Sequence, residues 1–371
     1  MSPARRAWLL ATLAGALPGR AATADTAATV AEPAADPVRR GRALGFPRDH
    51  GTHLGARTEW WYATGWLGTP AAPRAGFQVT FFRSATGLAP DNRSRFAARH
   101  LLFAHAALTR LGADGRATHH HDQRIARWSG EGGSALAHAA TADADVRLGP
   151  WWLKREGDAW RSRVPARDFT LDLTLERTQP VLLQGDAGFS RKGPDESQAS
   201  HYYSEPQLSA RNIEGGTTSE GRAWLDHEWS EQILHPQAVG WDWIGMNLFD
   251  GSALTAFALR RRDGSTLWAG GSFRAAGAAP LAFEPGQVRL TPGRRWRSPA
   301  TAASYPVQWQ VDSPEGAFSV RALADAQELD SRSSTGTVYW EGLSELLDAQ
   351  GRRVGLGYLE MTGYAAPLRM P

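Results

Sequence analysis

The chain has 371 residues, 42% of them hydrophobic and 21% charged, which is the composition of a folded protein and not of a disordered one. Three of its 41 basic side chains lie in the first 24 residues, which hold no acid, so the other 38 balance 38 acidic side chains. A body without net charge argues against nucleic-acid binding, and the lack of cysteine excludes disulfides.

The N-terminus has the three parts of an export signal. Arg5-Arg6 precedes an apolar run over residues 7–17, which is too short to span a membrane, and small residues follow up to Ala24. We therefore expect a periplasmic or secreted protein whose signal peptide is removed near Ala24, after export by the general secretory or the twin-arginine route. Residues 25–43, rich in alanine and proline, are predicted to be a flexible tether.

From residue 44 onward, short apolar or aromatic runs alternate with turn residues, which is typical of antiparallel β-structure. Residues 169–176 alternate strictly between apolar and polar side chains, the period of a half-buried strand. No segment has a sustained helical period, so the predicted fold class is all-β. The other predicted strands cover residues 60–67, 77–82, 101–108 and 307–311, and turns are predicted at Asp114-Gly115, Asp250-Gly251 and Asp263-Gly264.

The stretch from Asp226 to Trp229 places two acids close together in the sequence. In an extended strand, Asp226 and Glu228 share one face with Trp224, while His227 and Trp229 point to the other. If the first face lines an apolar cavity, desolvation raises the pKa of at least one carboxyl and makes it a proton donor. A polar, glycine-containing segment, residues 184–206, is predicted to form a long loop ahead of this strand and to carry Tyr202 and Tyr203.

Two short echoes indicate that one architecture is present twice. Residues 59–62 resemble residues 241–243, and residues 224–226 resemble residues 358–360. The first pair would open each half of the chain and the second pair would close it. We therefore predict two antiparallel barrels or strongly curved sheets, and a single continuous sheet would contradict this. The predicted domains cover residues 44–230 and 231–371.

Six segments, in this order along the chain, resemble the AttH/CrtC family. That family includes carotenoid 1,2-hydratase and bacterial exported proteins described as secreted hydrolases. The resemblance implies two lipocalin-like antiparallel β-barrel domains, the first ending around the Asp226 strand. The chain departs from the pattern at His201, where a third tyrosine is expected, and at Leu54, where proline is expected. The six segments are residues 46–51, 57–65, 226–230, 240–243, 339–342 and 357–364.

Hydration of an isolated carbon–carbon double bond needs a strong proton donor, aromatic faces that stabilise a carbocation, and one water. The sequence repeatedly places acids beside aromatic residues, which suits this reaction, although such acids could equally form structural hydrogen bonds or ion pairs. The candidate catalytic residues are Asp226, Glu228, His227 and Glu59. The candidate ligand-binding residues are Trp60, Trp61, Tyr62, Tyr202, Tyr203, Trp224, Trp229, Trp241 and Trp243; they could instead be core residues.

No motif for a metal, a phosphate group, a dinucleotide or a serine nucleophile is found, so no cofactor and no metal are predicted. His50 and His53 are three residues apart, and the histidine run 119–121 follows a predicted turn, where a solvated loop is expected.

Three functions remain open. The first is an exported, cofactor-independent hydratase that acts on an isoprenoid or another lipid, with Asp226 as the acid and Glu228 as the base that positions water. The second is a non-catalytic periplasmic carrier, since barrels with apolar interiors bind lipids. The family resemblance implies an ABC-type transporter permease as the partner of such a carrier. The third is a pericyclase-like protein whose aromatic pocket folds a polyene.

Overall fold

The computed structural model describes residues 37–88, 97–130, 136–232 and 234–368, which belong to one compact unit. The predicted export signal and residues 25–36 of the predicted tether lie outside the described residues. The described part of the chain contains no α-helix, and its single helical turn is the 3-10 helix η1 (Arg48–His50). Within the same residues, no helix has the length and apolar character needed to cross a membrane.

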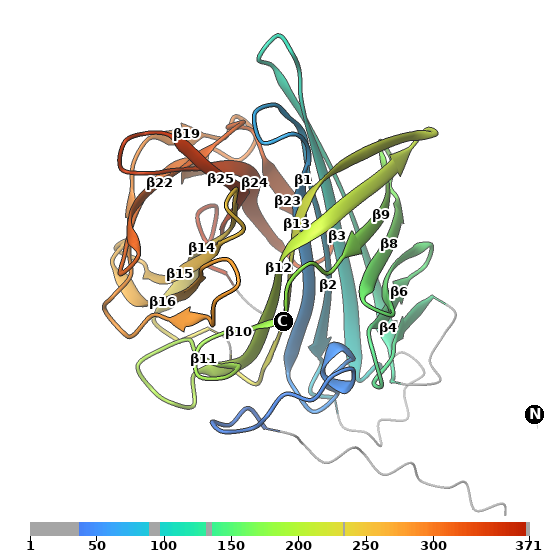
Figure 1. Ribbon diagram of the computed structural model, residues 1–371. Coiled ribbons are helices and arrows are strands. Elements are labelled where there is room, and N and C mark those ends of the chain that lie inside the picture. Colours follow the sequence, from blue (N-terminus) through green and yellow to red (C-terminus); the bar gives the residue numbers. More distant parts are fainter. Residues whose placement is uncertain (1–36, 89–96, 131–135, 233, 369–371) are drawn as a thin grey trace, which may run out of the picture. The chain divides into compact units, whose positions relative to one another are not determined.

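The first sheet has thirteen antiparallel strands. Its main path runs β4-β3-β2-β1-β13-β12-β9-β8-β7-β6-β5, and β10 and β11 pair with β12. Because β4 at one end of this path contacts β5 at the other, the sheet forms a nearly closed barrel (Figure 1). The strands are β1 (Thr58–Gly68), β2 (Pro73–Ala85), β3 (His100–Leu111), β4 (Ala117–Trp128), β5 (Ala137–Ala139), β6 (Asp145–Leu148), β7 (Trp151–Glu156), β8 (Ala159–Pro165), β9 (Thr170–Glu176), β10 (Leu182–Leu183), β11 (Phe189–Arg191), β12 (Ala199–Glu214) and β13 (Thr217–Ser230).

The second sheet has ten antiparallel strands and curls into a second barrel, seen as a ring at the left of Figure 1. Its path runs β17-β16-β15-β14-β25-β24-β22-β21-β18, with β23 beside β24, and β18 contacts β15. A separate pair joins β19 (Arg295–Arg297) and β20 (Ser304–Pro306). The ten strands are β14 (Ala238–Leu248), β15 (Ala253–Arg261), β16 (Thr266–Arg274), β17 (Leu281–Ala282), β18 (Arg289–Pro292), β21 (Gln308–Ser313), β22 (Gly316–Ala322), β23 (Glu328–Ser331), β24 (Thr337–Leu347) and β25 (Arg353–Met361).

Each barrel has its own apolar core, because alternate residues of its strands point inward. In β9, Leu171, Leu173 and Leu175 are fully buried in the first core, and burial stabilises each leucine by about 1.5–3 kcal/mol. Ile244 and Met246 of β14 belong to the second core. The prediction of an all-β fold with two lipocalin-like barrels is therefore confirmed.

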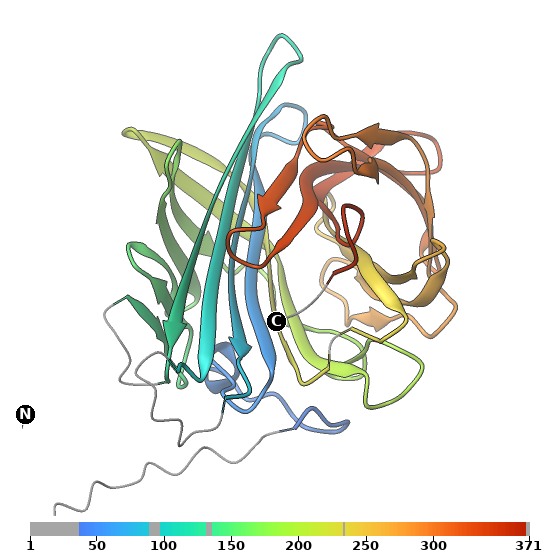
Figure 2. The same cartoon turned by 180° about the vertical axis from the view of Figure 1, so that it is seen from behind.

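A third apolar cluster joins the two sheets. It combines Tyr62 and Trp66 of β1 with Trp243 of β14 and Tyr358 of β25. Figures 1 and 2 both show β1, β12 and β13 beside the second sheet. Since Trp61 and Ala63 face the first core while Tyr62 and Trp66 face the second sheet, β1 is covered on both sides.

Hydrogen bonds reinforce this junction at β12, β13 and β14. The Asn247 side chain accepts a hydrogen bond from the Gln207 amide at 2.8 Å and donates one to the Ala223 carbonyl at 3.0 Å. The Gln207 side-chain amide donates to the carbonyl of Leu248 at 2.8 Å. Buried amide groups with complete hydrogen bonds fix the register of the two sheets.

The three predicted hairpin turns are confirmed, since Asp114-Gly115, Asp250-Gly251 and Asp263-Gly264 each connect strands that pair with one another. The long loop predicted at residues 184–206 is wrong from residue 199 onward, where β12 begins. This strand is buried on both faces and carries polar side chains that bond to other strands, so it lacks the alternation that marks a half-buried strand.

Two further local predictions also differ from the structure. The histidine run 119–121 lies within β4 and not in a solvated loop. The described end of the predicted tether is attached to the folded body, because Arg40 forms ion pairs with Asp186 and Glu196, and Arg42 forms one with Asp49 at 2.9 Å. These contacts join residues distant in sequence, or pair charges across a turn, and no local pattern signals them.

Candidate functional site

A cavity of about 140 Å³ lies between the two sheets. Its walls come from β1, β2, β3, β12 and β13 on one side and from β14, β15, β24 and β25 on the other. The barrel interiors are occupied by their own cores, so the expectation of an apolar binding site inside a barrel is wrong. Aromatic residues of the wall are Trp60, Tyr62, Phe82, Phe103, Tyr202, Trp241, Trp243, Phe257 and Tyr339.

Asp226, on β13, is the most perturbed carboxyl on the first-sheet side. Its Oδ1 accepts hydrogen bonds from Ser204 Oγ at 2.5 Å and Trp224 Nε1 at 2.6 Å, and its Oδ2 accepts one from the Tyr202 hydroxyl at 2.8 Å. Burial raises the pKa of Asp226 to about 7, although these three donors act in the opposite direction. The carboxyl therefore exchanges a proton near neutral pH.

Glu228 lies two residues further along the same face of β13 and has a different environment. Its Oε1 contacts Lys192 Nζ at 2.8 Å and accepts a hydrogen bond from Ser200. The Lys192 ammonium also lies 4.7 Å from the ring centre of Tyr202 and 4.2 Å from that of Phe257. The cavity thus holds one proton-donating carboxyl and one carboxylate paired with a cation.

Two more carboxyls enter the cavity from the second sheet. Glu341 on β24 and Glu360 on β25 are direct cross-strand partners. Burial and the neighbouring Glu360 raise the pKa of Glu341 well above its ordinary value. Burial also raises the pKa of Glu360 to about 7, with a further contribution from the charge of Asp226.

We did not predict Glu341 and Glu360 as site residues. The available signal was the echo between residues 224–226 and 358–360, which places Glu360 at the position equivalent to Asp226. The structure gives this echo a physical meaning, because β13 pairs with β1 just as β25 pairs with β14.

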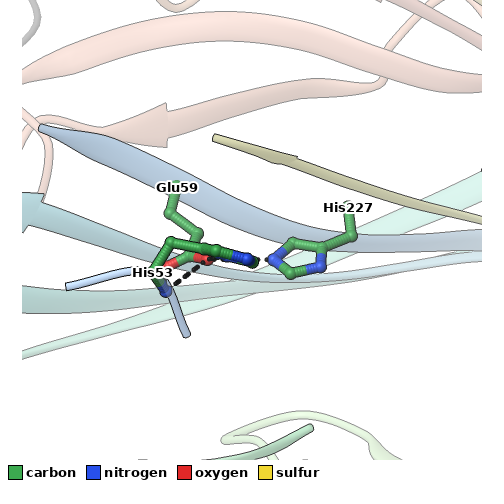
Figure 3. Close-up of side chains that lie close together, drawn as sticks. All are labelled: His53, Glu59 and His227. Atoms are coloured by element: carbon green, nitrogen blue, oxygen red, sulfur yellow. Dashed lines mark hydrogen bonds and ion pairs between the residues drawn. The ribbon is translucent and has the colours of Figure 1, made fainter. Parts of the chain in front are cut away.

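His227 points away from the cavity side of β13 and joins a separate buried network with His53 and Glu59 (Figure 3). Glu59 Oε1 lies 2.7 Å from His53 Nδ1 and 3.1 Å from His227 Nε2. Glu59 Oε2 accepts hydrogen bonds from Arg83 Nε at 2.9 Å and Thr52 Oγ1 at 2.6 Å. Burial alone would raise the pKa of Glu59, but Arg83 and the two histidines lower it well below its ordinary value.

The same network contains three atoms that could coordinate a metal ion. One ligand atom each from His53, Glu59 and His227 lies within 4.8 Å of the others. Both oxygens of Glu59 already accept hydrogen bonds, however, and the buried Arg83 guanidinium supplies the positive charge that a metal would bring. The donor set is therefore satisfied as an ion-pair network.

The predicted site residues thus divide between two places. The cavity wall includes Asp226, Glu228, Trp60, Tyr62, Tyr202, Trp241 and Trp243, with Glu59 at its border. Trp224 contributes its N–H to Asp226. His227, Trp61, Tyr203 and Trp229 lie outside the cavity wall, in the Glu59 network or in the adjoining apolar clusters. Trp241 and Trp243 share the cavity side of β14, as strand alternation predicted, while Asp242 points away.

Comparisons with known proteins agree with this architecture. A family model described as AttH-like matches residues 37–364. A crystal structure from Nitrosomonas europaea, provisionally named an AttH, is 47% identical with a TM-score of 0.78, and the match covers 88% of this chain and 99% of that one. Kievitone hydratase from Nectria haematococca is 16% identical with a TM-score of 0.64, over 87% of this chain and 93% of that one, which shows a shared fold. Among curated proteins, none matches this chain significantly.

Proposed function

The chain belongs to the AttH-like family, and we propose that it is a cofactor-independent hydratase, of the carotenoid 1,2-hydratase type, for a hydrophobic unsaturated substrate. The substrate class would be an isoprenoid or another lipid. The observation that carries this proposal is the Asp226 carboxyl, which is buried, has a pKa of about 7 and lies at a cavity with aromatic walls. A general acid is most effective when its pKa lies near the working pH.

Asp226 would start the reaction by transferring its proton to one carbon of the double bond. The π electrons form the new C–H bond, and the other carbon becomes a tertiary carbocation. Trp60, Trp243 and Tyr202 present aromatic faces to the cavity, and such faces stabilise a cation by about 0.5–2 kcal/mol each. Hydrogen bonds from Tyr202, Ser204 and Trp224 stabilise the Asp226 carboxylate that remains.

Glu228 would position the water that completes the addition. All its contacts with described residues use Oε1, so Oε2 remains for a water molecule. The water oxygen forms a bond to the carbocation, and its proton passes to Glu228 and then back to Asp226. The substrate gains one water as a tertiary alcohol, and both carboxyls return to their starting state.

An alternative is a non-catalytic periplasmic lipid carrier that works with an ABC-type transporter permease. The apolar and aromatic wall favours it, because such a surface binds a hydrophobic ligand without chemistry. Export and the transporter partner rest on the sequence predictions, and the export signal lies outside the described residues.

Native mass spectrometry of protein purified from its own host, followed by lipid extraction, tests the two functions against each other. For a hydratase, we expect a bound unsaturated lipid that gains the mass of one water during incubation. Asp226→Asn and Glu228→Gln should abolish or strongly reduce this gain, while Asp312→Asn, at a half-exposed pair with Arg289, should not. A lipid that stays unchanged with the wild-type protein would favour the carrier.

A further inference from the structure

A second cavity, of about 340 Å³, lies at one end of the second barrel. It is separate from the central cavity, because β14 divides the two: Trp241 and Trp243 face the central cavity, whereas Asp242 faces the second one. Its wall is continuous with the second core through Leu290 and Trp309. The proposed hydratase reaction makes no use of this space.

Two buried hydrogen-bond donors line this cavity without an acceptor among the described residues. They are Nη1 of Arg260 and the indole Nε1 of Trp309. Arg260 is 9% exposed and Trp309 is 3% exposed. Buried donors without partners are rare and costly, at about 1–3 kcal/mol each. Both groups are donors and neither is an acceptor, so the missing partner is an acceptor.

The rest of Arg260 is held rigidly. Its Nη2 donates a hydrogen bond to the Thr362 carbonyl at 2.7 Å, and its guanidinium lies 3.8 Å from the ring centre of Tyr364. Asp242 Oδ2 is 3.9 Å from Arg260 Nε, and Asp242 Oδ1 accepts a hydrogen bond from the Tyr364 hydroxyl at 2.9 Å. Asp242 therefore balances part of the Arg260 charge and leaves Nη1 without a partner.

Positive charge dominates the wall. Four arginines line the cavity, against two aspartates. Arg295 approaches from β19, where its guanidinium lies 5.7 Å from the Tyr364 ring, on the same residue that covers Arg260. The arginines are Arg260, Arg261, Arg262 and Arg295, and the aspartates are Asp242 and Asp263.

We propose that this cavity binds a small organic oxyanion, a carboxylate or a phosphate monoester, that carries an apolar body. The anionic oxygens accept hydrogen bonds from Arg260 Nη1, Trp309 Nε1 and the Arg295 guanidinium. The apolar body packs against Leu290 and Pro292. Guanidinium groups suit both oxyanions, because their N–H groups match the spacing of carboxylate and phosphate oxygens.

Asp242 makes the binding depend on pH. Burial raises the pKa of its carboxyl to about 6, although Arg260 acts in the opposite direction. Below this pH Asp242 becomes neutral and no longer repels the ligand, so affinity rises as the pH falls from 7.5 to 5.5. The charged and titratable groups that face it are Arg260, Arg261, Arg262, Asp263, Arg295 and Tyr364.

Isothermal titration calorimetry on the full chain tests the site with benzoate, phenyl phosphate and the neutral benzamide. We expect binding of benzoate, phenyl phosphate or both, and none of benzamide. Benzoate alone would assign a carboxylate ligand and phenyl phosphate alone a phosphate ester. Equal binding of benzamide, or no binding of either anion at millimolar concentration, would overturn the proposal.

Two variants locate the site without touching buried groups. Arg295→Gln should weaken anion binding about tenfold, the effect expected for one charge-assisted hydrogen bond. Arg297→Gln changes an exposed arginine of the same strand outside the cavity, and should leave the affinity unchanged. Equal losses in both variants would mean non-specific charge attraction and overturn the site.

A third variant tests the pH dependence. Asp242→Asn keeps an acceptor for the Tyr364 hydroxyl, removes the charge, and should bind the anion more tightly at pH 7.5 with no further gain at pH 5.5. A wild-type affinity that does not change between these pH values would contradict the role of Asp242. None of these results depends on turnover in the central cavity, so the proposal can fail or succeed independently of the hydratase.

Discussion

Replacing Asp226 by asparagine should stabilise the protein at alkaline pH while it removes the proposed acid. The pKa of this buried carboxyl is raised from 3.8 to about 7, so at pH 8 the native state holds a desolvated charge that it lacks at pH 5. The unfolded chain is ionised at both pH values. The raised pKa therefore costs the native state about 3 kcal/mol of stability between pH 5 and pH 8, and none below the unfolded pKa.

Urea denaturation followed by tryptophan fluorescence measures this effect at the two pH values. The variant should gain about 3 kcal/mol relative to wild type on going from pH 5 to pH 8. Comparing the two pH values cancels the pH-independent difference in hydrogen bonding between asparagine and Tyr202, Ser204 and Trp224. Asp312→Asn is the matched control and should give parallel profiles. Parallel profiles for Asp226→Asn would refute the raised pKa and with it the proposed acid.

Three further predictions follow from the other buried carboxyls. Glu59→Gln should lower the free energy of unfolding by about 3–5 kcal/mol, because it leaves Arg83 buried without a counter-charge, whereas Asp312→Asn at an exposed pair should cost about 0–1 kcal/mol; equal losses in denaturant titrations would contradict this. Dialysis against EDTA should leave the melting temperature unchanged, since Arg83 already neutralises Glu59; a clear drop would instead indicate a metal at Glu59. Glu360→Gln should lower the pKa of Glu341, measured by carbon-13 NMR titration, because a neighbouring negative charge is removed; an unchanged Glu341 would show that burial alone raises its pKa.

Local periodicity was sufficient to predict the strands, the turns and the direction of the key side chains. Alternation along β13 placed Asp226 with Glu228 and opposite His227, and the structure separates them into the cavity and the Glu59 network in this way. The echo between the two halves predicted the two barrels, because each half opens and closes with equivalent strands.

The position of the cavity could not be predicted from the sequence. Strands β1, β12 and β13 are buried on both faces, so the sequence does not show which face meets the other sheet. Glu341 and Glu360 meet only through the register of β24 and β25, and Lys192 reaches Glu228 from outside their paired strands. Such contacts depend on tertiary packing, which local patterns do not encode.

Hydration in deuterated water tests the central claim most directly. Wild-type protein, incubated with the unsaturated lipid extracted from it, should form an alcohol with one carbon-bound deuterium for each water added, because Asp226 supplies its exchangeable proton to carbon. Asp226→Asn, folded and still able to bind the lipid, should form none. An alcohol without carbon-bound deuterium, or equal labelling by Asp226→Asn, would contradict the proposal that Asp226 protonates the double bond.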